Sequence, residues 1–377
     1  MTAISPGTTH VPFLDLGAIH RGLKAELLEE ISELIDMGAF TGGPAVREFE
    51  HAFAEYVGTK LAVGVSSGLD ALRLALIAAG IRPGDEVIVP ANTFVATLEA
   101  VTQAGGRPVV VDMSEEDWNI EVAQVDAAVS SRTRFVMPVH LYGQLADMRA
   151  LDEIARRHGL AIIEDACQAH GAERDGLRSG ESGSAAAFSF YPGKNLGAFG
   201  DAGALTTNDE VLAEKIQALR EHGQRAKYAH DMEGYTARLD TIQAIVLLKK
   251  LACLDSWNDE RVAIASHYLQ ALEGVGDLEL PPVASGSSPV WHLFVVRTAE
   301  PRALAESLRE RGIATGRHYP VPVHLTRAYE WLGYGPGSFP RAERHGERAL
   351  SLPIFPGMSI EQADAVIAGV RAFFDRG

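Results

Sequence analysis

Seven short runs of apolar and β-branched residues follow one another between residues 61 and 207, and most are separated by longer segments. Some of those segments, such as DALRLALIAAG at 70–80 and MRALDEIARRHG at 148–159, repeat apolar residues at helical spacing. Several runs are continuously apolar, which is typical of strands buried on both faces. The runs are LAVGV (61–65), EVIVP (86–90), RPVVV (107–111), RFVMPV (134–139), LAIIE (160–164), AAAFSF (185–190) and GALTT (203–207).

This alternation of strand and helix restricts the chain to the α/β class. Parallel strands need long crossover connections, and helices are the usual crossovers, so the spacing predicts a mostly parallel sheet with helices on both faces. Ligands of such sheets bind beyond the carboxyl ends of the strands. We therefore expect functional residues directly after the apolar runs.

The pattern changes near residue 240, where the strand-and-helix alternation stops. Residues 240–272 are expected to form long helix, followed by a loop at 281–289, a strand at 290–297 and helices at 301–312 and 359–375. We predict a large α/β domain over residues 1–250, which includes an N-terminal helix at 20–37. A smaller α+β domain is predicted over residues 251–377.

Composition excludes several classes of partner. The net charge is −16 and the isoelectric point about 5.3, so the chain has no basic field for nucleic acid or an anionic membrane. The two cysteines, Cys167 and Cys253, form no CxxC pair, which favours reduced thiols. The N-terminus resembles no signal peptide, and no apolar run is long enough to span a membrane. We expect a cytoplasmic protein, and no residue spacing suggests a metal site.

The stretch GVSSGLDALRLAL at 64–76 joins a predicted strand to a predicted helix through a small-residue turn. Backbone N–H groups at a helix start have no partner within the helix and attract anions. Gly68 lets a phosphate approach that backbone closely. The alternative is that Ser66 or Ser67 only caps the helix. Neither a Walker loop nor a GxGxxG fingerprint is present.

Two further stretches place an acid and a lysine after strands. Asp165 follows the run at 160–164, where a buried carboxylate needs a cation or donor, although capping a helix would also explain it. Gln168 lies three residues on, within reach of the same face. Lys194 is isolated among glycines and aromatic residues in SFYPGKNLGAFGDAG, where apolar surroundings would lower the pKa of its amine.

A phosphate-binding turn, an acid and an isolated lysine in this order indicate a pyridoxal-phosphate site. That cofactor forms a Schiff base with a lysine, and an acid pairs with its pyridinium nitrogen. Phe94 follows the run at 86–90 and is placed to stack on the cofactor ring.

With these motifs assembled, the chain resembles the DegT/DnrJ/EryC1/StrS family of sugar aminotransferases. The resemblance is strongest to nucleotide-linked (dTDP) 3-keto-6-deoxyhexose 3-aminotransferases, and it extends from VPFLDL at 11–16 to LSLPIFPG at 350–357. The stretches that carry it include SSGLDALRLAL, PVHLYGQ, EDACQAHGA, AAFSFYPGKNLGAFGDAGA, VWHLFVVR and HYPVPVHL. It implies fold type I of the pyridoxal-phosphate enzymes and a homodimer with active sites at the subunit interface.

The resemblance also implies roles for individual residues. Lys194 would carry the cofactor, and Asp165 would hold the proton on its ring nitrogen. The remaining cofactor contacts would come from Gln168 on the ring oxygen, Phe94 on the ring, and Ser189 with the Gly68 and Leu69 backbone on the phosphate. The implied substrate contacts are Tyr191, Tyr228, His318, Tyr319 and His324, and we add Lys227 as a local cation.

One departure from the family stands at residue 236. The family commonly has asparagine in a GYNSRLD-like stretch, where it reaches the cofactor phosphate of the neighbouring subunit. This chain reads GYTARLD, with Thr236 at that place. A threonine hydroxyl is shorter than an amide, so the contact would be lost or bridged by water.

The implied activity is transfer of an amino group from glutamate to the C3 carbon of a dTDP-linked keto sugar. Amination of a 4-keto sugar by the same chemistry is the alternative enzyme. A non-catalytic regulatory protein on the same scaffold is the alternative from another class. Because Lys194 is present, a sugar dehydratase, whose branch has histidine there, is disfavoured.

Overall fold

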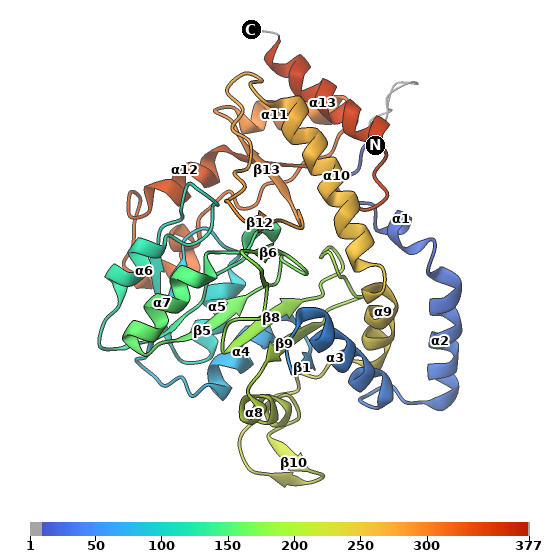
Figure 1. The fold of residues 1–377 in the computed structure, drawn as a ribbon, viewed down its shortest axis with the longest axis vertical. Helices are drawn as coiled ribbons and strands as arrows, with labels where there is room; N and C mark the ends of the chain where they lie inside the picture. The colour runs from blue at the N-terminus through green and yellow to red at the C-terminus, as the bar shows by residue number, and fades with distance from the viewer. Residues whose placement is uncertain (1–9, 376–377) are drawn as a thin grey trace.

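A seven-stranded sheet forms the centre of the computed structural model, which describes residues 10–375 (Figure 1). The strand order is β1-β9-β8-β5-β4-β2-β3. The strands are β1 (Leu61–Val65), β2 (Glu86–Pro90), β3 (Arg107–Val111), β4 (Thr133–Val136), β5 (Ala161–Asp165), β8 (Ala185–Ser189) and β9 (Gly203–Thr207). Each corresponds to one predicted apolar run, with ends that differ by at most three residues.

The sheet is parallel except for one strand. β9 runs antiparallel to both of its neighbours, β1 and β8, while β8, β5, β4, β2 and β3 pair in parallel. The predicted mostly parallel seven-stranded sheet is therefore confirmed. The connection after β8, residues 190–202, contains turns and no helix, and β9 returns antiparallel beside β8.

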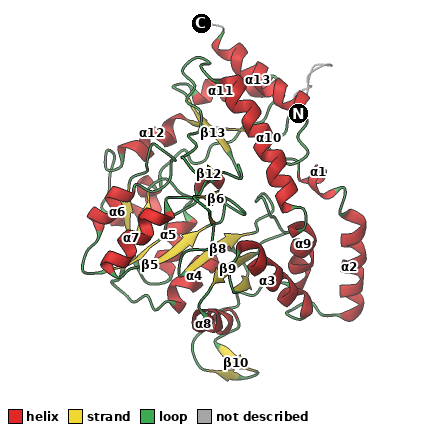
Figure 2. Ribbon diagram, viewed as in Figure 1, coloured by secondary structure: helices red, strands yellow, loops and turns green. Residues whose placement is uncertain are grey.

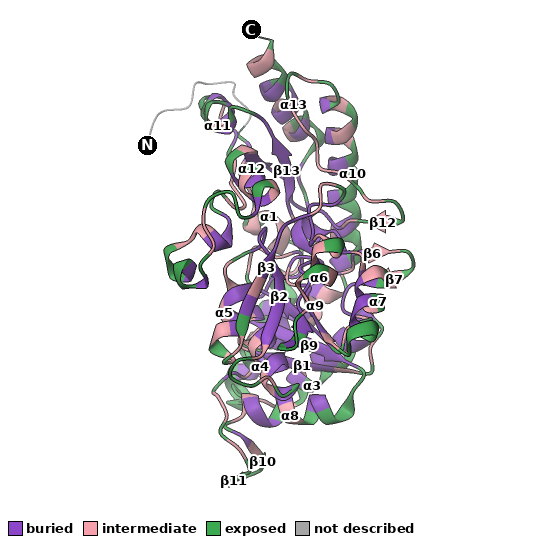
Figure 3. Cartoon of the chain, turned by 90° about the vertical axis from the view of Figure 1, so that its left-hand side faces the viewer, coloured by how far each residue is buried: buried purple, intermediate pink, exposed green. Residues whose placement is uncertain are grey.

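Helices cover both faces of the sheet (Figure 2). Side chains alternate between the faces along each strand, so Val87 and Val89 pack into one core and Ile88 into the other. Figure 3 shows the buried strands between these layers. The helices around the sheet are α3 (Pro44–Val57), α4 (Gly68–Ala78), α5 (Ala96–Gln103), α6 (Val122–Ala128), α7 (Met148–His158), α8 (Glu210–Arg220) and α9 (Thr241–Leu251).

The predicted long helix at 240–272 is wrong in one respect, because it is two helices. α9 ends at Leu251 and α10 (Leu254–Leu272) begins after a short turn in which the Cys253 amide donates to the Lys250 carbonyl at 3.0 Å. Apolar residues continue through this turn, so the hydrophobic pattern alone shows no break. The change of direction lets α9 pack against α3 and lets α10 pack against α13 (Ile360–Phe374).

The C-terminal elements gather around a core of their own. It joins α10 and α13 to a two-stranded sheet, and it also includes Val11 from the other end of the chain. Val11 donates to the Gly312 carbonyl at 3.0 Å and accepts from the Ala314 amide at 2.9 Å. The other C-terminal elements are β12 (Ser287–Ser288), β13 (Phe294–Arg297), α11 (Pro301–Glu310), α12 (Pro340–Arg348) and β14 (Ala349–Leu352), with 3-10 turns at Val323–Leu325 and Arg327–Leu332. The division at residue 250 stays a prediction.

The N-terminal helix expected at 20–37 is α2 (Lys24–Met37), which ends at Gly38 in the left-handed conformation (φ 64°). A short α1 (Leu16–His20) precedes it. A hairpin of β10 (Gln224–Ala226) and β11 (Ala229–His230) extends away from the body of the molecule (Figures 1 and 3). Strands β6 (Glu173–Arg174) and β7 (Leu177–Arg178) pair beside β12.

Across residues 10–375, none of the helices has the length and apolar character needed to cross a lipid bilayer. The prediction that the N-terminus is not a signal peptide depends partly on residues 1–9, which lie outside the described residues.

Candidate active site

A cavity of about 570 Å³ opens at the carboxyl ends of the sheet strands and is walled on the other side by C-terminal segments. It brings together most of the residues that the sequence predicted, from elements far apart in the chain. The predicted residues that line it are Gly68, Leu69, Phe94, Asp165, Gln168, Ser189, Tyr191, Lys194, His318 and Tyr319.

Lys194 lies in the loop that follows β8. Its amide donates to the Tyr191 carbonyl at 2.8 Å, which closes a tight turn and fixes the base of the side chain. Within residues 10–375 the ammonium forms no ion pair. Burial lowers the pKa of Lys194, while Cys167 and Asp165 act in the opposite direction. The amine therefore loses its proton more easily than that of a surface lysine.

Asp165 is the last residue of β5 and is 6% exposed. Its Oδ2 accepts a 2.8 Å hydrogen bond from the Thr97 hydroxyl, and its Oδ1 accepts a weaker bond from the Cys167 amide at 3.3 Å. No lysine or arginine pairs with this carboxylate in the part of the chain that the structure describes. The site therefore holds a buried acid oriented by neutral donors and still able to meet a cation.

Gln168 is oriented by two contacts. Its Oε1 accepts a hydrogen bond from the Tyr142 amide at 2.8 Å. Its Nε2 therefore points the other way and donates to the Tyr319 hydroxyl at 3.2 Å. Tyr142 lies in the 3-10 turn Leu141–Gly143, in the left-handed region with φ 60°.

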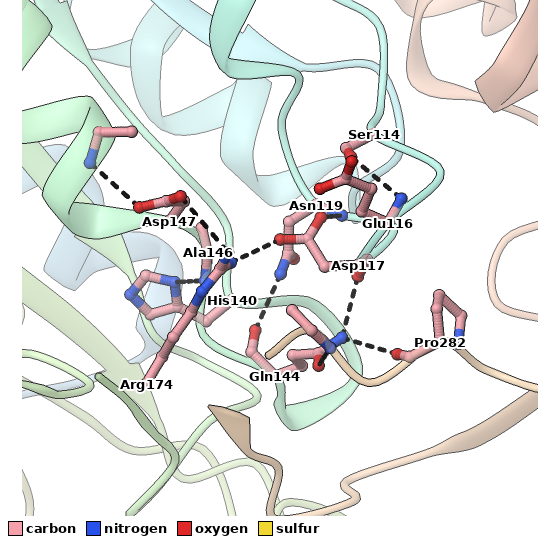
Figure 4. A network of polar contacts seen from close by, with 12 residues as sticks. Ser114, Glu116, Asp117, Asn119, His140, Gln144, Ala146, Asp147, Arg174 and Pro282 are labelled. Atoms are coloured by element: carbon pink, nitrogen blue, oxygen red, sulfur yellow. Dashed lines mark hydrogen bonds and ion pairs between the residues drawn. The ribbon is translucent and has the colours of Figure 1, made fainter. Parts of the chain in front are cut away.

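A polar network holds the loop around that turn (Figure 4). Gln144 Nε2 donates to the Asp117 carbonyl at 3.2 Å and to the Pro282 carbonyl at 3.1 Å. Arg174 pairs with the Asp117 carboxylate at 2.8 Å. Burial raises the pKa of Asp117, and the pairing with Arg174 opposes that shift. The network fixes the turn that presents the Tyr142 amide to Gln168.

The β1–α4 turn forms the far end of the cavity. Ser67 caps α4, since its hydroxyl accepts from the Asp70 amide at 3.0 Å, so the capping interpretation holds. Gly68 opens the helix, and a Cβ there would lie 2.7 Å from both Cys167 Sγ and Ser189 Cβ. Only glycine fits, and the Gly68 and Leu69 N–H groups stay open to an anion.

The aromatic residues of the cavity differ in exposure. Phe94 and Tyr191 are 51% and 59% exposed, and the Phe94 ring lies 5.4 Å from that of Tyr319. The His318 ring stacks on Phe13 at 5.7 Å, and its Nδ1 lies 2.8 Å from the Ser351 hydroxyl. Burial and the nearby Lys194 lower the pKa of His318 to about 4, so it is neutral at physiological pH.

Four predicted residues do not reach this cavity. Lys227 and Tyr228 lie exposed in the β10–β11 turn, and Thr236 is exposed with its hydroxyl 3.1 Å from His222 Nε2. His324 is buried, with Nε2 3.1 Å from a Glu343 carboxylate oxygen. A contact of His324 with substrate therefore stays a prediction, since within this chain the ring is directed to Glu343.

The sequence interpretation missed several residues that line or support the cavity. Thr97 supports Asp165 from α5, and Phe13, Arg261 and His292 line the cavity. His292 lies within VWHLFVVR, a stretch recognised for its resemblance without its histidine being singled out. Arg261 follows a helical pattern that reads as an exposed charged face, so no local signal marked it as buried.

The residues present fit pyridoxal phosphate. The cradle at Gly68, which any Cβ would fill, suits a phosphate group, and Ser189 lies beside it. The unpaired Asp165 carboxylate suits a protonated ring nitrogen, and Lys194 lies in the same cavity as both.

Comparison with known proteins agrees with this chemistry. A dTDP-3-amino-3,4,6-trideoxy-alpha-D-glucose transaminase from Streptomyces venezuelae is 50% identical over 369 residues, which cover 98% of this chain and 97% of that protein. The crystal structure of S. venezuelae DesV in complex with a ketimine intermediate matches with a TM-score of 0.96 and 50% identity, covering 98% of this chain and 100% of that one.

A solved structure of NtdA from Bacillus subtilis with bound cofactor PMP matches with a TM-score of 0.91 and 31% identity, covering 99% of this chain and 87% of that one. The model of the DegT/DnrJ/EryC1/StrS aminotransferase family matches residues 22–371. The resemblance inferred from the motifs is thereby confirmed: this chain belongs to the DegT/DnrJ/EryC1/StrS aminotransferase family.

Proposed function

We propose that this chain is a pyridoxal-phosphate-dependent aminotransferase that transfers an amino group from glutamate to C3 of a dTDP-linked 3-keto-6-deoxyhexose. The observation that carries the proposal is the convergence of Lys194, Asp165 and the Gly68 turn on one cavity in a member of this family. The S. venezuelae transaminase, named for a 3-amino sugar, supports the choice of C3 and of a dTDP sugar.

The cofactor would be held by residues at both ends of the cavity. Ser189 and the Gly68 and Leu69 amides would bind its phosphate, and Asp165 would hold the proton on its ring nitrogen. Gln168 Nε2 would bond the ring oxygen, and Phe94 would stack on the ring. When bound, pyridoxal phosphate supplies an electron-withdrawing ring that stabilises negative charge on the adjoining carbon.

Lys194 performs the proton transfer in both halves of the reaction. Its amine, whose pKa burial lowers, removes the proton from the α-carbon of glutamate. In the second half it returns a proton at C3 of the sugar. The Thr97 and Cys167 donors orient the Asp165 carboxylate, so that it would face the ring nitrogen in a fixed position.

The proposal includes a homodimer with shared sites. Lys227, Tyr228 and Thr236 are exposed and lie outside the cavity of their own chain, as expected for residues that contact a neighbouring subunit. We also propose a cytoplasmic location, supported by the absence of a disulfide between Cys167 and Cys253. The division into domains at residue 250 belongs to the same proposal, supported by the separate C-terminal core.

A single incubation tests the function. The purified protein is given glutamate with either a dTDP-linked 3-keto-6-deoxyhexose or its 4-keto isomer, and NMR locates the new amino group. We expect amination at C3 and release of 2-oxoglutarate. Amination only of the 4-keto sugar would establish the alternative enzyme, and no exchange of nitrogen with either sugar would favour the regulatory alternative.

A further inference from the structure

Arg261 is a buried cation in the wall of the active-site cavity. It projects from α10, is 2% exposed, and lines the cavity that also contains Lys194. No carboxylate of residues 10–375 pairs with it. The adjoining acid, Glu260, is exposed and its carboxylate accepts from the Gly357 amide at 2.6 Å.

Only part of the guanidinium has hydrogen-bond partners. Nη1 donates to the carbonyls of Ile354 at 2.9 Å, Trp291 at 3.2 Å and His292 at 3.4 Å. Nε is buried without a partner, and Nη2 donates to no described residue. Nε and Nη2 form the side of the guanidinium that holds a carboxylate through two parallel hydrogen bonds.

A buried charge without a counter-ion is costly, because desolvation is not offset by attraction. Burial lowers the pKa of Arg261 to about 10, which still leaves it charged near neutral pH. Three carboxylates, Glu99, Asp165 and Asp201, line the same cavity, but none of them forms an ion pair with Arg261. The other titratable groups do not neutralise it either. Lys194 has the same sign, and burial keeps His292 and His318 neutral by lowering the pKa of each. An anion in the cavity would therefore be strongly favoured.

A short chain of contacts connects Arg261 to the reacting lysine. Arg261 holds the His292 carbonyl, and His292 Nδ1 lies 3.2 Å from Oδ1 of Asn195, the residue next to Lys194. Both Nδ2 hydrogens of Asn195 are used, by Asn258 at 2.8 Å and the Val290 carbonyl at 2.9 Å, so its Oδ1 faces the imidazole. Arg261 is thus tied to the part of the cavity where the α-carbon of an amino acid must lie.

The cofactor phosphate and the diphosphate of the sugar nucleotide are less suited to bind this arginine. The open amides of Gly68 and Leu69, on the β1–α4 turn, are available for the cofactor phosphate. Arg261 is anchored instead to segments 291–292 and 354, in the opposite wall. A buried position also suits a carboxylate beside the reacting carbon better than the diphosphate of a sugar nucleotide, which needs an open path for its nucleoside.

We propose that Arg261 binds the carboxylate of the amino donor through Nε and Nη2 and so selects an amino acid as donor. This inference rests on the proposed function and names the residue that recognises the first substrate. The same cation faces no carboxylate when the keto sugar occupies the cavity. Loss of the guanidinium should therefore harm one half of the reaction and spare the other.

The test measures the two halves separately in Arg261→Gln. In the first, cofactor-loaded enzyme is mixed with glutamate, and the visible absorbance of the cofactor is followed over a single turnover. We expect the half-saturating glutamate concentration to rise about 100-fold, as for removal of one partner from a buried charge pair. In the second, enzyme reconstituted with pyridoxamine phosphate is mixed with the keto sugar, and its rate should change less than about threefold, since the guanidinium contacts no group of the sugar.

Binding of glutarate, a dicarboxylate without an amino group, provides a readout that does not depend on turnover. Calorimetry should detect glutarate binding to the wild type and a loss of at least about tenfold in affinity for the variant. Arg371→Gln is the matched control, because Arg371 also donates to a backbone carbonyl, that of Ala271 at 2.6 Å, and does not line the cavity. It should leave both half-reactions unchanged.

Each outcome bears on a different statement. If the wild type does not react with glutamate, the proposed donor is wrong. If the wild type reacts and Arg261→Gln reacts at the same glutamate concentrations, Arg261 does not bind the donor. A selective loss of the sugar half-reaction would assign Arg261 to the sugar nucleotide and overturn the inference. If Arg261→Gln does not fold, Arg261→Lys replaces it in the test. That variant keeps the positive charge but cannot form the two parallel hydrogen bonds, so it must still weaken glutarate binding.

Discussion

The hydroxyl of Thr97 donates a 2.8 Å hydrogen bond to Oδ2 of Asp165. Thr97 belongs to α5 and Asp165 to the end of β5, so the bond joins two crossover units of the sheet. A second hydroxyl, that of Thr93, lies 2.7 Å from Thr97 Oγ1 and completes a short chain of buried oxygens. Asp165 therefore does not depend on solvent for its orientation.

Thr97→Val should lower turnover by roughly 10-fold to 100-fold, because a hydrogen bond to a charged group contributes about 1.5–3 kcal/mol. Cofactor binding should change less, since Lys194 and the phosphate contacts remain. Steady-state rates and the cofactor absorbance of the purified variant provide the measurement. Thr97→Ser keeps the hydroxyl and should restore most of the rate; equal defects in both variants would point to packing instead.

Lys194→Ala should reduce turnover by at least roughly 1000-fold, because it removes the group that moves protons at the reacting carbons. The absorbance that depends on covalent attachment of the cofactor should also be missing from the purified protein. Lys194→Arg serves as control, since it keeps a cation of similar length that cannot form a Schiff base. Turnover near the wild-type rate in either variant would contradict the assignment of Lys194.

Gly68→Ala should lower cofactor affinity by about tenfold or more, because the new Cβ would lie 2.7 Å from Cys167 Sγ and Ser189 Cβ. Relief of that contact displaces the turn whose amides face the phosphate. Equilibrium titration of the apoprotein with pyridoxal phosphate measures the change. Gly22→Ala is the control, since a Cβ there meets nothing within 4 Å.

Acid should destabilise the fold through histidines that are buried in the neutral form. Burial lowers the pKa of His345 to about 3, from an ordinary value of 6.5 in the unfolded chain. Between these values the unfolded chain binds one more proton, so stability is full above pH 6.5 and falls as the pH drops towards 3. Each such histidine contributes a slope of about 1.4 kcal/mol per pH unit.

Urea unfolding at pH values from 7 to 4 measures this slope. His345→Gln removes the titrating group and keeps an amide that can meet Tyr142, whose hydroxyl lies 3.0 Å from His345 Nε2. In the variant, the free energy of unfolding should change less steeply with pH, because unfolding takes up nearly one proton fewer. An unchanged slope would show that His345 already carries its proton in the native fold.

Mixed dimers should reveal shared active sites. A chain with Lys194→Ala lacks its own lysine, and a chain with Tyr228→Ala lacks the exposed hairpin tyrosine. If the hairpin of one subunit serves the cavity of the other, co-expressed chains regain activity at one site of each mixed dimer. No activity above that of either parent would place the role of Tyr228 outside the neighbouring cavity, and size-exclusion chromatography with light scattering verifies the assembly.

The sequence predicted the sheet well because its strands are short, apolar and separated by helices of ordinary length. It also predicted the residues directly after β1, β5 and β8, since chain order alone brings those ends to one edge of the sheet. The split between α9 and α10 was not predictable, because a break that needs neither proline nor glycine leaves no mark in the apolar pattern.

The remaining wall of the site could not be read from local sequence. Thr97, Arg261 and His292 acquire their roles through contacts with residues more than sixty positions away or through burial that their neighbours in sequence do not indicate. The predicted substrate contact of His324 also depends on more than its local sequence. Its stretch resembles the family's substrate-facing segment, but within this chain the ring is directed to Glu343.

The pairing of Val11 with the segment around Ile313 has a consequence for the order in which the protein becomes functional. Phe13 and Leu14, two and three residues beyond Val11, line the cavity, and so does His318. During synthesis, the start of the chain must wait for more than three hundred residues before its partner exists. The active site is therefore completed only near the end of translation, and a nascent or truncated chain that already contains Lys194 still lacks the wall that encloses it.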